Sequence, residues 1–149
     1  MSSDIPTLDR IEWHAQSRVF PADLPRESAG THIGMFAAWC ALNGHWSAAL
    51  RTSMADSLDK LQRRQITGRE FVELECAGDL VVELFTEEGG KFAGAYYGGR
   101  YIKDYKRVLA ATLPSEYHVE DSWTNYDLLA PVIDAAFKKW RHPPWWKLF

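Results

Sequence analysis

Cysteine is scarce in this chain. Only Cys40 and Cys76 occur among 149 residues, and neither belongs to a Cys-x-x-Cys pair or another metal-type spacing. This scarcity argues against a disulfide-stabilised scaffold and against a cysteine-rich zinc domain. Cys40 stands in an apolar run, which is typical of a small buried residue rather than a nucleophile. We expect both thiols to be reduced, as they are in cytoplasmic proteins.

Long hydrophobic segments are also missing. The longest apolar run covers residues 33–42, about half of the ~20 residues that a helix needs to cross a bilayer. Residues 1–9 do not combine a basic start with an apolar stretch, so no secretory signal is predicted. The sequence therefore predicts a cytoplasmic protein with no membrane partner.

Basic residues are absent from residues 70–88, although the net charge of the whole chain is only −3. The same segment contains the acids Glu70, Glu73, Glu75, Asp79, Glu83, Glu87 and Glu88. They either form an ordinary solvated face or present a surface to a basic partner. Lysines and arginines lie elsewhere, without one basic stripe and interleaved aromatics, so nucleic acid is not an expected partner.

The hydrophobic pattern favours helices. His32, Phe36, Trp39 and Asn43 recur at helical spacing, and the residues between them are also largely apolar. A helix that is apolar nearly all round is buried, so residues 28–43 are predicted to form a central helix. Thr67–Glu70 fits a capping box at the start of another helix. Residues 80–85 resemble a strand, but no partner strand is evident.

These signals predict an all-α fold: one compact domain of about five or six helices around the central helix. Residues 1–25 are expected to form an irregular N-terminal arm, punctuated by prolines. Residues 142–149 form an aromatic tail after Pro143–Pro144. The exposed aromatic side chains of the tail would be unfavourable in water, so we expect the tail to dock either on the protein's own core or on a partner.

The segment 117–127 gathers aromatics, acids and a histidine more densely than a surface loop needs. His118, Glu120 and Asp121 are the residue types of acid–base or metal chemistry. However, no nucleophile accompanies them, and the five histidines are scattered. Three interpretations stay open: catalysis, a capped structural loop, or a partner-binding surface anchored by Trp123 and Tyr126. The sequence thus predicts no catalytic residue, no metal ligand and no cofactor.

A second group of polar residues lies on the predicted central helix. His32 and Asn43 share a face with Trp39, so these three side chains either line a pocket or are polar groups satisfied within the core. If the helix and the 117–127 segment converge in space, His118 would join that pocket.

Several runs together resemble one family of small bacterial proteins, a domain of unknown function. They are residues 31–39 with Asn43, residues 66–69, residues 95–97, Tyr101 with residues 104–105, and residues 117–134. The resemblance covers roughly residues 12–140. Gly98–Gly99 and the Trp145–Trp146 tail depart from the family pattern.

The resemblance implies an immunity protein that neutralises a secreted antibacterial toxin, such as a type VI secretion effector. Such a protein binds its toxin without turnover, so no enzymatic activity is expected. A nuclease toxin, with its basic surface, would fit the acidic segment. The predicted partner-binding residues are Glu70, Glu73, Glu83, Glu87, Glu120, Asp121, Trp123 and Tyr126. The alternative is a small enzyme or ligand-binding protein that uses a pocket of histidine, acid and aromatic side chains. The oligomeric state stays open.

Overall fold

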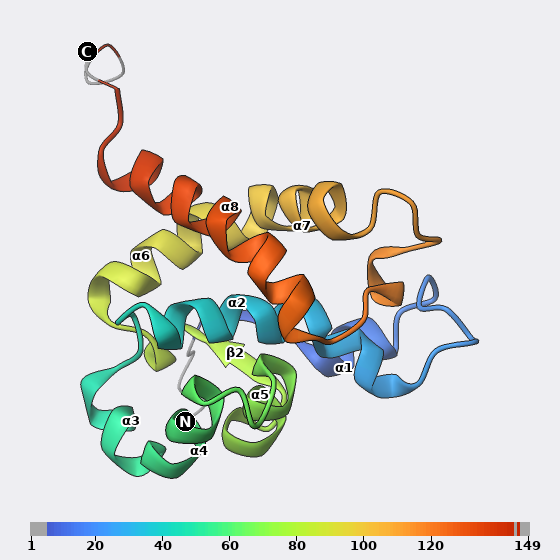
Figure 1. Cartoon of the computed structure of the whole chain (residues 1–149), viewed down its shortest axis with the longest axis horizontal. Helices are drawn as coiled ribbons and strands as arrows, with labels where there is room; N and C mark the ends of the chain where they lie inside the picture. The colour runs from blue at the N-terminus through green and yellow to red at the C-terminus, as the bar shows by residue number, and fades with distance from the viewer. Residues whose placement is uncertain (1–5, 145, 147–149) are drawn as a thin grey trace.

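The computed structural model of the protein describes residues 6–144 and 146, and helices dominate it (Figure 1). The α-helices are α1 (Ile11–Ala15), α2 (Thr31–Leu42), α3 (Ala48–Ser53), α4 (Ala55–Gln62), α5 (Gly68–Cys76), α6 (Glu87–Tyr96), α7 (Ile102–Leu109) and α8 (Trp123–Arg141). A π-helical turn, Tyr97–Tyr101, joins α6 to α7, and short 3-10 turns cover Arg26–Gly30, Val82–Leu84 and Glu116–His118. Two short strands complete the chain, β1 (Thr7–Arg10) and β2 (Asp79–Val81). The predicted mostly helical, compact architecture is confirmed.

Helix α2 is the centre of the fold, as the sequence predicts. Every residue from Thr31 to Ala41 is buried. Figure 1 shows α2 crossing the middle of the molecule, with α3–α5 on one side and α6–α8 on the other. Because partners surround α2, its side chains bury apolar area in every direction, which is the main favourable term for folding.

Two glycines allow α2 and α5 to approach backbone to backbone. A Cβ atom added at Gly34 would lie 2.1 Å from the backbone nitrogen of Arg69, and one added at Gly68 would lie 1.9 Å from the carbonyl oxygen of Gly34. Neither position can therefore hold a larger residue without moving a backbone. Thr67 caps α5 through the capping box predicted from the sequence, with both reciprocal bonds to Glu70 present.

The N-terminal arm is more regular than the sequence predicts. Residues 7–10 pair with β2 as an antiparallel strand, so the segment around residue 80 does have a partner. Helix α1 follows at once, and Ile11 is 1% exposed. The prediction of an irregular arm over residues 1–25 is thus wrong for residues 7–15. A two-stranded pair this short has no periodicity to detect, and its halves lie about seventy residues apart.

Side chains also cap two helices in the second half of the chain. Thr86 caps α6, and Ser122 caps α8 by accepting a bond from the backbone N–H of Asn125. Gly98–Gly99 lies within the π-helical turn that joins α6 to α7. In the aromatic tail, Trp145 and residues 147–149 lie outside the described residues, and Trp146 is 62% exposed. Among the described residues, no helix combines the length and apolar character needed to span a bilayer.

Candidate functional site

Three side chains from three elements converge beside the first turn of α2. Asp9 comes from β1, His14 from α1 and His32 from α2. Asp9 Oδ1 lies 2.8 Å from His14 Nε2, His14 Nε2 lies 3.3 Å from His32 Nε2, and His32 Nε2 lies 3.4 Å from Asp9 Oδ2. These three residues are the α2 triad. It is the one group of three or more histidine, cysteine or acid side chains with metal-binding geometry found in the described part of the chain.

A bulge in the strand pair contributes to the position of Asp9. The register shifts between Thr7 and Asp9, so Leu8 is the extra residue. Bulges re-aim side chains and are frequent beside functional sites. Asp9 is 7% exposed, although it belongs to a short two-stranded sheet. Its Oδ1 also accepts a bond from the backbone N–H of Arg10, which fixes the carboxylate plane.

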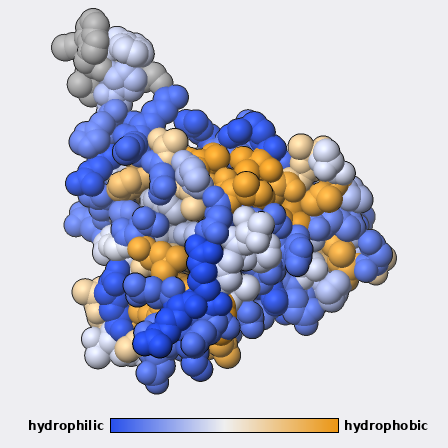
Figure 2. Space-filling view, viewed as in Figure 1, coloured by the Kyte–Doolittle hydropathy of each residue, from blue (hydrophilic) through white to orange (hydrophobic). Residues whose placement is uncertain are grey.

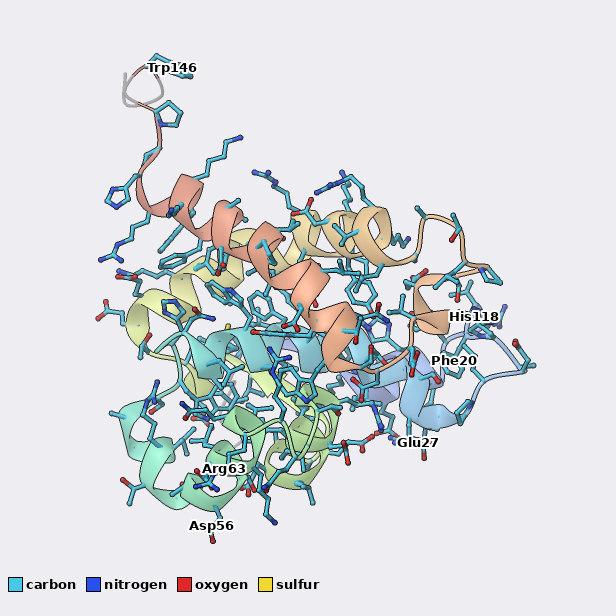
Figure 3. All side chains as sticks on the ribbon, viewed as in Figure 1. Phe20, Glu27, Asp56, Arg63, His118 and Trp146 are labelled. Carbon is cyan, nitrogen blue, oxygen red and sulfur yellow. The ribbon has the colours of Figure 1, made fainter. Side chains whose placement is uncertain are left out.

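Tyrosines surround the triad. The Tyr97 hydroxyl donates to Asp9 Oδ2 at 2.6 Å, and the Tyr101 hydroxyl donates to the backbone oxygen of His32 at 2.5 Å. The Tyr117 hydroxyl lies 2.6 Å from His14 Nδ1. The Tyr117 ring also packs on Phe20, with a centroid distance of 5.1 Å. Figure 3 labels Phe20 and its neighbour His118 at this end of the molecule.

The protonation states of the triad follow from these contacts. Burial alone would raise the pKa of Asp9, but hydrogen bonds from His14, His32 and Tyr97 outweigh it and hold that pKa well below the usual range. Burial lowers the pKa of His32, which favours its neutral imidazole. Burial also disfavours the charged form of Tyr117 and raises its pKa to about 12, so its hydroxyl keeps its proton. The triad thus holds an ionised carboxylate and at least one imidazole lone pair.

No permanent cation neutralises Asp9. Among the described residues, no lysine or arginine lies within ion-pair distance of its carboxylate; the neighbouring Arg10 pairs with Asp79 at 3.5 Å. Buried charges in proteins are ordinarily paired or coordinate a metal. The Asp9 charge is therefore met only by hydrogen-bond donors and by histidine.

The triad borders a cavity of about 240 Å³, the α2 pocket. Leu8 and Ile102 supply apolar walls, and the π-helical turn contributes Tyr97, Gly98 and Tyr101. Single π-helical turns inside helices occur frequently at functional sites. Here the turn places two tyrosine hydroxyls toward the triad while its glycines leave the wall thin. The pocket combines a charged group, aromatic walls and an opening, as ligand sites do.

The pocket predicted from the sequence is only partly assembled. His32 lines the α2 pocket, but Trp39, Asn43 and His118 are not among its lining residues. The Trp39 indole donates to Asp134 Oδ1 at 2.7 Å, and the Asn43 amide donates to the backbone oxygen of Trp39. His118 contacts Ser115 and Asp23. For Trp39 this bond matches the alternative of a polar group satisfied within the core, whereas Asn43 is exposed at the C-terminal end of α2, so its prediction as part of a buried face is wrong.

The acids predicted to bind a partner largely have partners within the chain. Glu73 pairs with Arg69 at 3.3 Å, Glu87 pairs with Lys91 at 3.3 Å, and Glu70 is part of the capping box. Glu83 is exposed. The basic partners of Glu73 and Glu87 come from just outside the acidic segment, so the sequence window 70–88 alone does not show these pairs.

Residues 117–134 mainly connect helices to one another, and we call the contacts of Asp121 with Thr67 and Arg69 the α5–α8 joint. Asp121 Oδ2 accepts from Thr67 Oγ1 at 2.6 Å and from Arg69 Nε at 2.9 Å, which ties the start of α8 to the start of α5. Trp123 lies under the guanidinium of Arg64, 4.7 Å from the ring centre, and Tyr126 is buried. Glu120 remains exposed.

Asp9 and His14 were missed at the sequence level. Both lie in the segment interpreted as an irregular arm, and neither belongs to a recognised metal-ligand spacing. Tyr117, which opens the dense 117–127 segment, is the one residue there that reaches the triad. The sequence offers only one indication of this site: Asp9 and His14 lie five residues apart. That spacing alone does not predict a ligand site.

A comparison with known protein families gives one match: residues 7–119 fit the model of a domain of unknown function, DUF7832. The chain belongs to the DUF7832 family. The matched span contains the whole triad and its tyrosines and ends before α8. No curated protein and no solved structure matches the chain.

Proposed function

We propose that this protein binds a small ligand in the α2 pocket, and that the ligand carries a positive charge or several hydrogen-bond donors. The observation that supports this is the ionised Asp9, which faces a cavity with no lysine or arginine among the described residues to neutralise it. A cationic or donor-rich ligand completes the charge balance that the chain itself leaves open.

The size of the pocket limits the ligand. A cavity of about 240 Å³ holds the volume of about eight water molecules at ~30 Å³ each. This is below the range of drug-sized pockets, which begins at about 300 Å³. We therefore expect a compact amine, amidine or polyol, or one end of a longer molecule that projects past Gly98.

The test is a fragment library of small amines, amidines and polyols, screened by protein-observed NMR in EDTA. Wild-type protein should show shifts at His14, His32 and Tyr97, and Asp9→Asn should abolish them. The matched control is Asp127→Asn, an exposed carboxylate paired with Arg64 and remote from the pocket lining. Fragments that bind Asp9→Asn as well as wild type, or a library without any pocket ligand, would contradict the proposal.

Binding to a protein partner is a second candidate, as an immunity protein that blocks a secreted toxin. It is supported by exposed apolar surface, because large patches of this kind often mark interaction sites. Figure 2 shows apolar side chains gathered where α7 and α8 lie side by side. Leu128 on α8 is 57% exposed, and Trp13 on α1 is 53% exposed. Tryptophan is enriched among residues that dominate binding energy.

Co-expression with the product of an adjacent toxin gene tests this candidate. The protein should rescue growth, and Leu128→Asp together with Trp13→Ala should reduce rescue while leaving the melting temperature within a few degrees of wild type. Reversal of Glu73, Glu83 and Glu87 to lysine should slow association at low salt if the acids steer a basic toxin. Failure of rescue by the wild-type protein would remove the immunity role and leave ligand binding untouched.

A further inference from the structure

We propose that Asp9, His14 and His32 bind a divalent transition-metal ion of the kind that imidazole and carboxylate share, such as Zn²⁺. This inference deepens the proposed function, because it rests on the same pocket and names the cation that would occupy it. Two histidines and one carboxylate are an established ligand set for catalytic zinc and for non-haem iron.

The spacing of the three ligand atoms fits such an ion. Ligands at ~2.1 Å from a metal, separated by angles of 90° to 109°, lie ~3.0 to 3.4 Å from one another. His14 Nε2 and His32 Nε2 lie 3.3 Å apart, and they lie 2.8 Å and 3.4 Å from Asp9 Oδ1 and Oδ2, respectively. One ligand atom from each of the three residues lies within 4.8 Å of the other two. An ion therefore needs small side-chain shifts rather than a rearrangement of the backbone.

The surrounding bonds orient the ligands. Metal-binding histidines usually donate their second ring N–H to an oxygen, which fixes both tautomer and ring orientation. Tyr117 places its hydroxyl oxygen 2.6 Å from His14 Nδ1, so Nε2 is the atom left for the metal. Tyr97 holds Asp9 through Oδ2, and Tyr101 holds the backbone of His32. Tyrosine hydroxyls thus hold the side chains of His14 and Asp9, while Tyr101 bonds only the backbone oxygen of His32.

The triad also leaves coordination positions open. Structural zinc sites are closed by four protein ligands, whereas catalytic sites keep a position for water or substrate. Here three protein ligands line one wall of a cavity, and the described residues offer no fourth histidine, cysteine or acid to the group. Because the triad lines the cavity, water or a neutral polyol ligand would take the free positions, whereas a cationic ligand would compete with the ion for Asp9.

The test uses the metal alone as the probe. Full-length protein is stripped with EDTA, dialysed, and titrated with Zn²⁺ by calorimetry and with Co²⁺ by visible absorption. We expect one site per chain, d–d bands from Co²⁺, and a rise in melting temperature of about 5–10 °C at a hundredfold excess of Zn²⁺ over Kd. His14→Gln should weaken binding at least a hundredfold.

Controls separate this site from adventitious binding. His118→Gln removes another half-buried histidine that sits beside a carboxylate, Asp23, and it should bind Zn²⁺ as wild type does. If His14→Gln does not fold, Asp9→Asn replaces it, and NMR of the imidazole nitrogens of His14 and His32 reports the metal directly. Absence of binding to wild type, or equal binding by His14→Gln, overturns the metal site. Fragment binding in EDTA would still stand in that case, so the two proposals fail separately.

Discussion

Asp9 and Asp121 are both largely shielded carboxylates that join distant parts of the chain, yet they are neutralised in different ways. Asp121 faces the guanidinium of Arg69, a permanent cation, and the Thr67 hydroxyl. Asp9 faces two histidines and the hydroxyl of Tyr97. The first site is complete within the chain, whereas the second leaves a negative charge next to a cavity.

The difference separates a structural joint from a ligand site. A carboxylate fixed by arginine stabilises the native state and has no reason to change partner. A carboxylate fixed by histidine and a tyrosine hydroxyl keeps the capacity to bind a cation, because imidazole can ligate a metal as well as donate a hydrogen bond. The dense 117–127 segment mostly joins helices, while two of the three triad residues, Asp9 and His14, come from the arm predicted to be irregular.

The largest expected effect concerns the framework on which both sites depend. Gly34→Ala should lower the free energy of unfolding by about 3 kcal/mol, because its Cβ would collide with the backbone of α5 next to Arg69. Urea denaturation measures this loss. Gly94→Ala, a helical glycine with nothing within 4 Å of an added Cβ, is the matched control and should be neutral or stabilising. Equal effects of the two substitutions would refute the close crossing.

A smaller loss is expected at the joint itself. Asp121→Ala leaves the Nε–H of Arg69, whose side chain is only 19% exposed, and the hydroxyl of Thr67 without their acceptor, although Arg69 keeps its ion pair with Glu73. The free energy of unfolding should fall by about 2 kcal/mol, with Zn²⁺ binding unchanged. Asp127→Ala breaks an ion pair to Arg64 whose side chains are about half exposed, and its effect should be close to zero. If Asp121→Ala abolished metal binding, the distinction between joint and ligand site would be lost.

Asp9→Asn should change stability least of the three. The amide keeps the shape of the carboxylate and its oxygen still accepts from Tyr97, but its NH2 group replaces the oxygen that accepts from the backbone N–H of Arg10, so we expect a loss of about 1 kcal/mol in EDTA. Addition of Zn²⁺ should then stabilise wild type but not the variant. A loss as large as that of Asp121→Ala, measured by the same urea titration, would make Asp9 a structural residue instead.

The smallest expected effect concerns the reactivity of the Cys76 thiol, at the end of α5 just before β2, which reports how readily this segment opens. Burial, with Glu75 and Asp79 nearby, raises the pKa of Cys76 to about 12. At pH 8 the thiolate fraction is then about a thousandfold below that of a thiol with pKa near 9, and the rate of alkylation should rise about tenfold per pH unit. Iodoacetamide labelling followed by mass spectrometry measures it. Fast labelling at pH 8 would mean that the α5–β2 segment, which holds β1 and Asp9, opens readily.

Local signals in the sequence predicted much of the fold. The central helix follows from an apolar run longer than a strand, and the starts of α5, α6 and α8 follow from side chains that cap the backbone within three residues. The strand pair was missed because β1 and β2 are short and distant in sequence. For the site, His32 was found because it lies on a periodic helix, while Asp9 and His14 carry no such pattern.

The sequence by itself determined that this protein is helical, that α2 is buried, and where several helices begin, because caps and periodicity act over one or two turns of chain. Only the tertiary structure decided which charges meet. It paired the acids of residues 70–88 with bases outside that window, and Asp121 with Arg69. It also brought Asp9 and His14 to His32, with no lysine or arginine of the described residues at ion-pair distance, because contacts across 18 to 23 residues depend on how the whole chain packs.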